Sequence, residues 1–140
     1  MSIQKNELVV KDVMLENNQF PIVQERILIK ETLDKMNEFS IGIACVVDED
    51  MLLKAVFCDG DIRRTILNNQ QTISAFFVDD ALEYGVYDYK SVLEQTKLID
   101  AVKLMEKFKV WDLPVIDSNQ VLKGLLHLHP AVSYLLESKD

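Results

Sequence analysis

The sequence contains no apolar run long enough to cross a bilayer as a helix, so a membrane-spanning helix is excluded. Its first residues, 1–11, are polar and lack the apolar core of a secretory signal peptide. We therefore expect a cytoplasmic protein that makes no contact with membranes.

Cysteine and histidine are scarce, with two of each among 140 residues. Their spacing matches no recognisable zinc-binding pattern, and we expect neither a metal site nor a cofactor. Cys45 and Cys58 both lie in apolar, strand-like runs. In a reducing compartment the simplest interpretation is therefore two buried thiols.

Basic residues are outnumbered by acidic ones, 15 to 23, which gives a formal net charge of −8. An acidic chain has no long-range attraction for nucleic acid or for anionic lipid, and we expect it to bind neither. An anionic ligand would have to be held by a local basic site. Because the sequence shows no nucleophile–base pair and no glycine-rich phosphate loop, we also expect no catalytic activity.

The most informative feature present is an internal repeat. A shift of 69 places residues 27–68 on residues 96–137 without a gap, with seven identities in 42 positions. The identities are few, but the apolar pattern matches through the expected helices and strands. The identical pairs are Met36/Met105, Phe39/Phe108, Val46/Val115, Asp48/Asp117, Leu53/Leu122, Lys54/Lys123 and Leu67/Leu136.

Each half predicts the same succession of elements. An amphipathic helix with apolar residues at helical spacing comes first, followed by a wholly apolar strand, a polar turn, a second strand and a closing helix. A short strand before each first helix would complete a β-α-β-β-α unit. The expected strands are 20–23, 43–47 and 52–57 in the first half and 91–93, 113–116 and 121–126 in the second, and the closing helices are 61–67 and 130–136.

The helix boundaries carry familiar signals. Asp59 is a plausible N-cap of the first closing helix, and Pro130 suits the first turn of the second. Segment 70–90 is the least regular part, and we expect it to form a linker helix. Since a lone half would have a marginal core, the two halves are expected to pack together.

This duplicated order resembles a pair of CBS (cystathionine-beta-synthase-type) domains, known as a Bateman module. Segment Val56–Arg64, Val-Phe-Cys-Asp-Gly-Asp-Ile-Arg-Arg, is similar to the family's strand-end motif, and Val10–Met14 is similar to the segment that leads into the first CBS unit in the bacterial D-arabinose 5-phosphate isomerase family. Segment Leu122–His129, Leu-Lys-Gly-Leu-Leu-His-Leu-His, resembles the CBS pair of the bacterial D-arabinose 5-phosphate isomerases. The resemblance covers residues 10–137 and leaves out the isomerase domain, which carries that family's catalysis.

The resemblance implies an α/β (α+β) fold of two β-α-β-β-α units, packed sheet to sheet about a pseudo-twofold axis. We accordingly expect residues 1–69 to form the first CBS unit with its lead-in, residues 70–90 a linker segment, and residues 91–140 the second CBS unit. It also implies a nucleotide site in the cleft between the units.

In the first half, Asp61 would accept ribose hydroxyls, and Arg63 and Arg64 would hold phosphate near a helix N-terminus. A plainer alternative is that Asp59 caps the helix, Asp61 favours its positive end and the arginines are solvated. The expected ligand contacts are Gly42, Ile43, Ala44, Cys58, Asp61, Arg63 and Arg64.

The second half offers a possible second site. Trp111 could stack on a base, and Leu113 would line the slot. His127 and His129 are two residues apart, so on a strand they would share a face and could contact an anion at mildly acid pH. Histidines that simply finish the sheet are the plainer alternative.

Three residues depart from the family's pattern. Ala55 stands where a glycine is usual, and Cys58 stands where Thr or Ser usually donates to the ligand. Pro130 stands where the second half should have an aspartate, which removes the ribose contact there.

The resemblance favours a regulatory ligand-sensing module that forms homodimers. It would bind an adenine nucleotide such as AMP or ATP, or a sugar nucleotide such as a CMP-sugar. Its partner would be an enzyme of sugar-phosphate or cell-envelope sugar metabolism, such as a sugar-phosphate isomerase or a nucleotidyltransferase domain. The alternative is a structural dimerisation module with a decayed nucleotide site.

Overall fold

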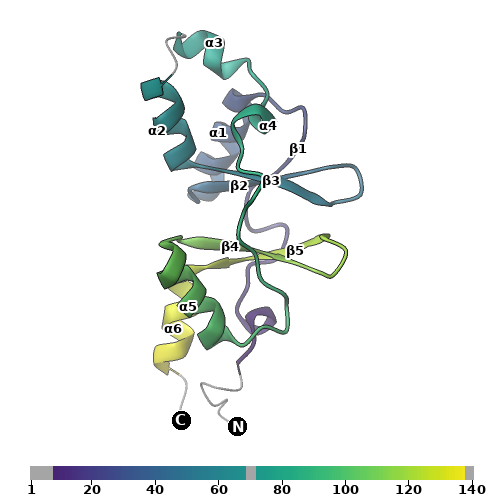
Figure 1. Cartoon of the computed structure of the whole chain (residues 1–140), viewed down its shortest axis with the longest axis vertical. Coiled ribbons are helices and arrows are strands. Elements are labelled where there is room, and N and C mark those ends of the chain that lie inside the picture. The colour runs from purple at the N-terminus through teal and green to yellow at the C-terminus, as the bar shows by residue number, and fades with distance from the viewer. Residues whose placement is uncertain (1–7, 69–71, 138–140) are drawn as a thin grey trace. The chain divides into compact units, whose positions relative to one another are not determined.

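The computed structural model describes residues 8–68 and 72–137, which form two compact units (Figure 1). One unit consists of residues 18–68 and 72–89, and it contains the first repeat. The other consists of residues 8–17 and 90–137, and it contains the second repeat. We call them the first-repeat unit and the second-repeat unit.

The first-repeat unit is built on a three-stranded sheet with the order β1-β2-β3. Strand β2 is central, parallel to β1 and antiparallel to β3, and all five of its residues are buried. This burial explains its unbroken apolar sequence. The elements are β1 (Ile22–Gln24), α1 (Ile29–Phe39), β2 (Ile43–Val47), β3 (Leu53–Cys58), α2 (Asp59–Asn68), α3 (Ile73–Phe77) and α4 (Ala81–Tyr84).

The second-repeat unit contains the hairpin β4–β5, with α5 and α6 side by side (Figure 1). In place of a counterpart to β1, Val92 forms an isolated parallel bridge with Val115 of β4. The elements are a 3-10 helix, η2 (Val10–Asp12), then α5 (Leu98–Phe108), β4 (Asp112–Ile116), β5 (Leu122–His127) and α6 (Leu128–Glu137).

The backbone confirms the repeat and its offset of 69. Helices α1 and α5 both end in a left-handed residue, Ser40 and Lys109, each with φ of 55°. Both hairpin turns have a residue of positive φ, Met51 at 65° and Gln120 at 66°. Both hairpins also shift register at equivalent places, between Val46 and Val47 and between Val115 and Ile116.

Two segments outside the repeats are grouped differently from the expected division of the chain. The lead-in, expected with the first repeat, lies in the second-repeat unit, where Leu15 and Leu125 exchange backbone hydrogen bonds of 2.8 and 3.1 Å. Residues 72–89, expected as a linker, belong to the first-repeat unit, where Val86 and Val56 exchange bonds of 2.7 and 3.0 Å. In both units a distant segment thus satisfies the backbone groups along the outer edge of a hairpin.

This edge pairing accounts for Ala55. A Cβ on Gly124 would lie 2.6 Å from the Leu15 carbonyl oxygen, so the lead-in requires a glycine there. At the equivalent place in the first repeat, the covering segment supplies the glycine instead, because a Cβ on Gly85 would lie 3.0 Å from that of Ala55. The glycine thus lies on the strand in the second repeat (Gly124) and on the covering segment in the first (Gly85). In both cases the two backbones approach closely.

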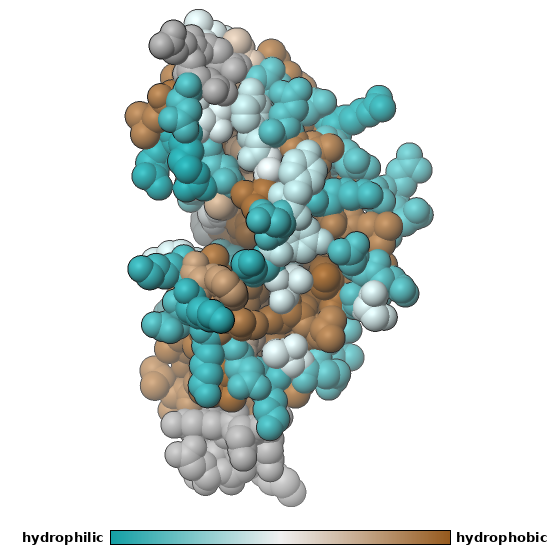
Figure 2. Space-filling view, viewed as in Figure 1, coloured by the Kyte–Doolittle hydropathy of each residue, from teal (hydrophilic) through white to brown (hydrophobic). Residues whose placement is uncertain are grey.

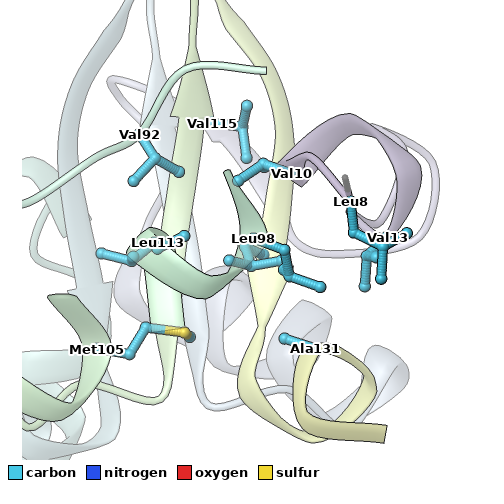
Figure 3. Close-up of a cluster of buried hydrophobic side chains, with 11 residues drawn as sticks. Leu8, Val10, Val13, Val92, Leu98, Met105, Leu113, Val115 and Ala131 are labelled. Atoms are coloured by element: carbon cyan, nitrogen blue, oxygen red, sulfur yellow. The ribbon is translucent and has the colours of Figure 1, made fainter. Parts of the chain in front are cut away.

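Each unit has its own hydrophobic core. Val10 of the lead-in is fully buried in the second-repeat core beside Leu98 and Val115 (Figure 3). In the first-repeat core, Phe57 of β3 packs with Ile29 of α1 and Phe76 of α3. The result is a mixed α/β fold of two small sheets with helices. Within the described ranges 8–68 and 72–137, no helix has the length and apolarity to cross a membrane.

Candidate functional site

The N-terminus of α2 follows strand β3 without an intervening loop. Strand β3 ends at Cys58 and α2 begins at Asp59, whose N–H donates to the carbonyl oxygen of Gly42 across 3.1 Å. Gly42 lies just before β2, so this bond joins the start of α2 to the beginning of the central strand. The same connection recurs in the second repeat, where the N–H of Leu128 donates to the carbonyl oxygen of Trp111 across 2.9 Å.

Asp61 is the most constrained polar residue of this region. It is 6% exposed, and its Oδ2 accepts the N–H of Cys58 at 2.9 Å and the Cys58 thiol at 3.1 Å. Its Oδ1 accepts from Nη2 of Arg64 at 2.7 Å. A buried carboxylate is stable only when it is hydrogen-bonded or paired in this way.

The helix cap differs from the expectation. Asp59 was expected as the N-cap, but it lies inside α2 as the first residue, and Cys58 holds the N-cap position. The carboxylate of Asp61, three residues after Cys58, accepts a hydrogen bond from the Cys58 N–H, which is one half of a capping box. Burial raises the pKa of the Cys58 thiol, and the neighbouring Asp61 carboxylate raises this pKa further.

Two cationic side chains accompany Asp61. Arg64 keeps 57% of its side chain exposed while pairing with Asp61, which raises the pKa of the guanidinium. Its Nη1 and Nη2 would lie 3.0 and 3.1 Å from a Cβ on Gly60, so the guanidinium covers the first turn of α2. Arg63 is exposed. The structure therefore gathers Cys58, Asp61 and Arg64 in direct contact.

The remaining predicted contacts of the first half lie at the start of β2. Gly42 is exposed, and a Cβ there would lie 2.5 Å from Oδ2 of Asp59, so a larger residue would displace that carboxylate. Ile43 and Ala44 are buried, at 6% and 0% exposure. Of these three residues only Gly42 is exposed.

The second repeat carries a different pair at the equivalent place. Nδ1 of His127 lies 2.7 Å from Oδ1 of Asp112, which is its register partner across β4 and β5. The corresponding pair in the first repeat is Ile43 and Cys58. Burial raises the pKa of Asp112, while His127 partly offsets that rise. No sequence pattern pairs these two residues, because their contact depends on the hairpin register.

The two histidines do not share a strand face, contrary to the expectation. Strand β5 ends at His127, and His129 is an exposed residue of α6. The expectation was wrong because the strand passes directly into the helix, so the alternation of a strand ends at His127. Trp111 is 73% exposed and Leu113 is 1% exposed, so of these two only Trp111 presents a side chain to solvent.

Helix α6 also lacks the charged residues that α2 has at the equivalent positions. Val132 and Ser133 of α6 stand at the positions of Arg63 and Arg64, and Pro130 stands at that of Asp61. Helix α6 contains no lysine or arginine. Among the residues that the structure describes, no group of three or more His, Cys, Asp or Glu side chains could hold a metal ion.

Comparison with known proteins agrees with this architecture. No family model matches the chain. The arabinose 5-phosphate isomerase KdsD of Francisella tularensis is 27% identical over 129 residues, which cover 89% of this chain and 37% of the isomerase. The chain thus spans just over a third of the length of this curated relative. It is a distant homologue of the CBS region of these isomerases.

Solved structures establish the fold as that of a CBS domain pair. CBSX2 of Arabidopsis thaliana, crystallised in complex with AMP, superimposes with a TM-score of 0.80 at 24% identity, covering 92% of this chain and 96% of that one. The CBS pair of MJ0100, in complex with 5′-methylthioadenosine and S-adenosyl-L-methionine, gives a TM-score of 0.75 at 20% identity, covering 92% and 95% of the two chains.

Proposed function

We propose that this chain, with the fold of a CBS domain pair, is a non-catalytic regulatory module that binds an adenine nucleotide or a sugar nucleotide through its first repeat. The observation that carries the proposal is the N-terminus of α2, where Asp61 is held against Arg64, with the exposed Arg63 next in the chain. A carboxylate and two guanidinium groups at a helix N-terminus match the ribose hydroxyls and the phosphate of a nucleotide.

Binding would require an exchange of partners at Asp61. Arg64 occupies one carboxylate oxygen and Cys58 occupies the other. A ribose hydroxyl would take over Oδ1 as the guanidinium of Arg64 turns outward to the phosphate. Since 57% of that side chain is already exposed, the movement requires no repacking of the core. The positive end of the α2 dipole would add to the positive potential there.

The similarity to other CBS proteins supports this choice of ligand. CBSX2 was crystallised with AMP, and MJ0100 with adenosyl ligands. The similarity to KdsD supports a partner enzyme of sugar-phosphate or cell-envelope sugar metabolism, either an isomerase or a nucleotidyltransferase. A CMP-sugar is the corresponding sugar-nucleotide candidate. In this proposal the module is cytoplasmic and homodimeric and passes ligand occupancy to the partner.

The second repeat would bind a nucleotide weakly or not at all. Its helix α6 has Pro130 in place of the acceptor and no cation at the two following equivalent positions. The possible second site of Trp111, Leu113, His127 and His129 stays a prediction, with Leu113 buried and His127 already paired with Asp112.

A structural dimerisation module is the second candidate. It is favoured by the complete internal satisfaction of Asp61, which would keep this carboxylate buried and hydrogen-bonded without any ligand. In that case the Asp61–Arg64 pair would serve only to anchor α2 on β3.

A thermal-shift screen distinguishes the two candidates. The set comprises AMP, ADP, ATP, CMP, GTP, a CMP-sugar and arabinose 5-phosphate, the last as a sugar phosphate without a base. A ligand at a hundred times its dissociation constant stabilises the fold by about 2.7 kcal/mol, which is readily measured. We expect a shift with at least one nucleotide that is lost in Asp61→Ala and reduced in Arg63→Ala. No shift with any of them would leave the dimerisation module.

A further inference from the structure

Four lysines lie at and near the C-terminal end of α5, all of them within the second-repeat unit. Lys103 and Lys107 are one helical turn apart on α5, and Lys109 is its C-cap. Lys90 comes from the segment that precedes the helix. All four are exposed, and they are four of the seven basic residues in the described part of this unit. We call these four residues the lysine patch.

The patch includes an aromatic ring. Nζ of Lys90 lies 4.7 Å and Nζ of Lys107 lies 5.4 Å from the centroid of the Phe108 ring. An ammonium group at such a distance is attracted by the electron-rich face of the ring. Phe108 is itself 38% exposed, so it offers apolar surface between the cations. Figure 2 shows long hydrophilic side chains over this unit with hydrophobic atoms beside them.

No carboxylate of the described residues neutralises the patch. Glu106 and Asp100 lie on the same helix, but none of the four lysines forms a salt bridge with any residue that the structure describes. Their positive charge is therefore available to a group from outside the chain.

The fold does not require these cations. Helix α1 of the first repeat ends in the same left-handed conformation as α5, and it has no basic residue in its last turn. Lysines near a helix C-terminus interact favourably with its dipole, but α1 forms without them. Phe39 of α1 is equivalent to Phe108 and has no such lysines around it. The residues at the positions of the four lysines are Pro21, Asp34, Glu38 and Ser40.

We propose that the lysine patch binds an acidic segment of a partner protein, with carboxylates on the lysines and an apolar side chain against Phe108. Complementary charge selects such a segment and orients it. The chain carries a net charge of −8, so it repels a long, uniform polyanion. A short acidic segment is held locally, because distant charges are screened beyond about 10 Å at 0.1 M salt. The proposal rests on the proposed function only in that the module has a partner protein, and it requires no nucleotide.

Fluorescence anisotropy on the full chain tests the proposal with a labelled probe, a short peptide in which glutamates flank a central pair of leucines. The reference probes are the same peptide with glutamine in place of every glutamate, and a polyglutamate of equal charge. We expect the leucine-containing acidic peptide to bind most tightly and the neutral peptide not to bind. Binding should weaken at high salt.

Two double variants of equal net charge locate the binding site. Lys90→Gln with Lys107→Gln removes two cations of the patch, and Lys97→Gln with Lys123→Gln removes two exposed lysines elsewhere on the same unit. The first should raise the dissociation constant by about tenfold or more, and the second should change it by less than about twofold. Phe108→Ala should reduce the affinity for the leucine-containing peptide to that for polyglutamate.

Three results would overturn the proposal. They are no saturable binding of the leucine-containing acidic peptide at low salt, equal losses in the two double variants, and equally tight binding of single-stranded RNA. Melting temperatures of the variants are the control for folding. Because the probes contain no nucleotide and the substitutions lie outside α2, failure here would leave the nucleotide site standing. Loss of nucleotide binding in Asp61→Ala would likewise leave peptide binding unchanged.

Discussion

Nη2 of Arg64 lies 2.7 Å from Oδ1 of Asp61, one turn further along α2. The opposite oxygen of the same carboxylate accepts the N–H of Cys58, the last residue of β3. Asp61 thus joins the end of a strand to the first turn of the helix that follows it. It is also the acceptor on which the proposed nucleotide site depends.

Replacement of Asp61 by alanine should destabilise the first-repeat unit. The Cys58 N–H and the Arg64 guanidinium would both lose their acceptor, at a cost of about 1–3 kcal/mol. Asp61→Asn should cost less, because its amide oxygen can still accept one of these bonds. Urea denaturation gives the free energies of unfolding. Arg63→Ala in the same helix is the matched exposed control, with an expected change within about 0.5 kcal/mol; an equal loss in that control would contradict the assigned role.

The Asp61 carboxylate should also slow the chemistry of the Cys58 thiol. Burial raises the pKa of this thiol, and the hydrogen bond and charge of Asp61 raise it further. Asp61→Asn removes the charge, so more thiolate should be present and alkylation by iodoacetamide at pH 8 should be faster. Cys58→Ser gives the background from Cys45, which is buried. An unchanged or slower rate in Asp61→Asn would show that the carboxylate does not act on the thiol.

Asp112 should make the second-repeat unit less stable as the pH rises. Burial raises its pKa in the folded chain, so above about pH 4 the folded state binds more protons than the unfolded state. Stability then falls as the pH rises through the folded-state pKa. Asp112→Asn does not titrate, so its stability relative to wild type should improve between pH 4 and pH 7. Denaturation at several pH values measures this, and an opposite trend would contradict the effect of burial.

The two hairpin turns should weaken in acid. Backbone hydrogen bonds from Val121 and Asn119, together with the charge of Lys123, lower the pKa of Asp117. At Asp48, burial acts in the opposite direction, but bonds from Leu52 and Asp50 and the charge of Lys54 outweigh it and lower the pKa.

A lowered carboxylate pKa contributes stability that is present above about pH 4 and lost as the pH falls through the folded-state pKa. The double variant Asp48→Asn with Asp117→Asn keeps an oxygen acceptor in each turn but removes the charge. Its stability should therefore fall less steeply than that of wild type between pH 5 and pH 3. Glu49→Gln in the same turn is the control, and a slope in the double variant as steep as in wild type would refute the prediction.

The elements within each repeat could be predicted because apolar periodicity is a local property. Strand β2 has the predicted bounds 43–47, and the predicted helix starts at Asp61 and Pro130 were only two residues late. Both predicted helix starts were late for the same reason: in each repeat the strand passes into the helix without a loop. Gly60 and Pro130 lie inside the first turn of their helices, so they do not mark where the strand ends.

The long-range pairings could not be predicted. Leu15 pairs with Leu125, and Val86 pairs with Val56, because each hairpin edge needs a partner. The sequence pattern does not say which distant segment supplies it. The candidate site shows the same limit: Asp61 was identified as an acceptor, but its engagement by Cys58 and Arg64 depends on side-chain geometry. The Asp112–His127 contact depends on hairpin register in the same way.

Isothermal titration calorimetry of the full chain with AMP and with ATP tests the central claim most directly. We predict saturable binding of one of them with a stoichiometry of one per chain, because only the first repeat has the acceptor and the cations. Asp61→Ala should abolish this binding, the double variant Arg63→Ala with Arg64→Ala should weaken it, and Trp111→Ala should leave it unchanged. Absence of saturable binding with both would contradict an adenine nucleotide as the ligand, and binding that persists in Asp61→Ala would contradict a nucleotide site at the N-terminus of α2.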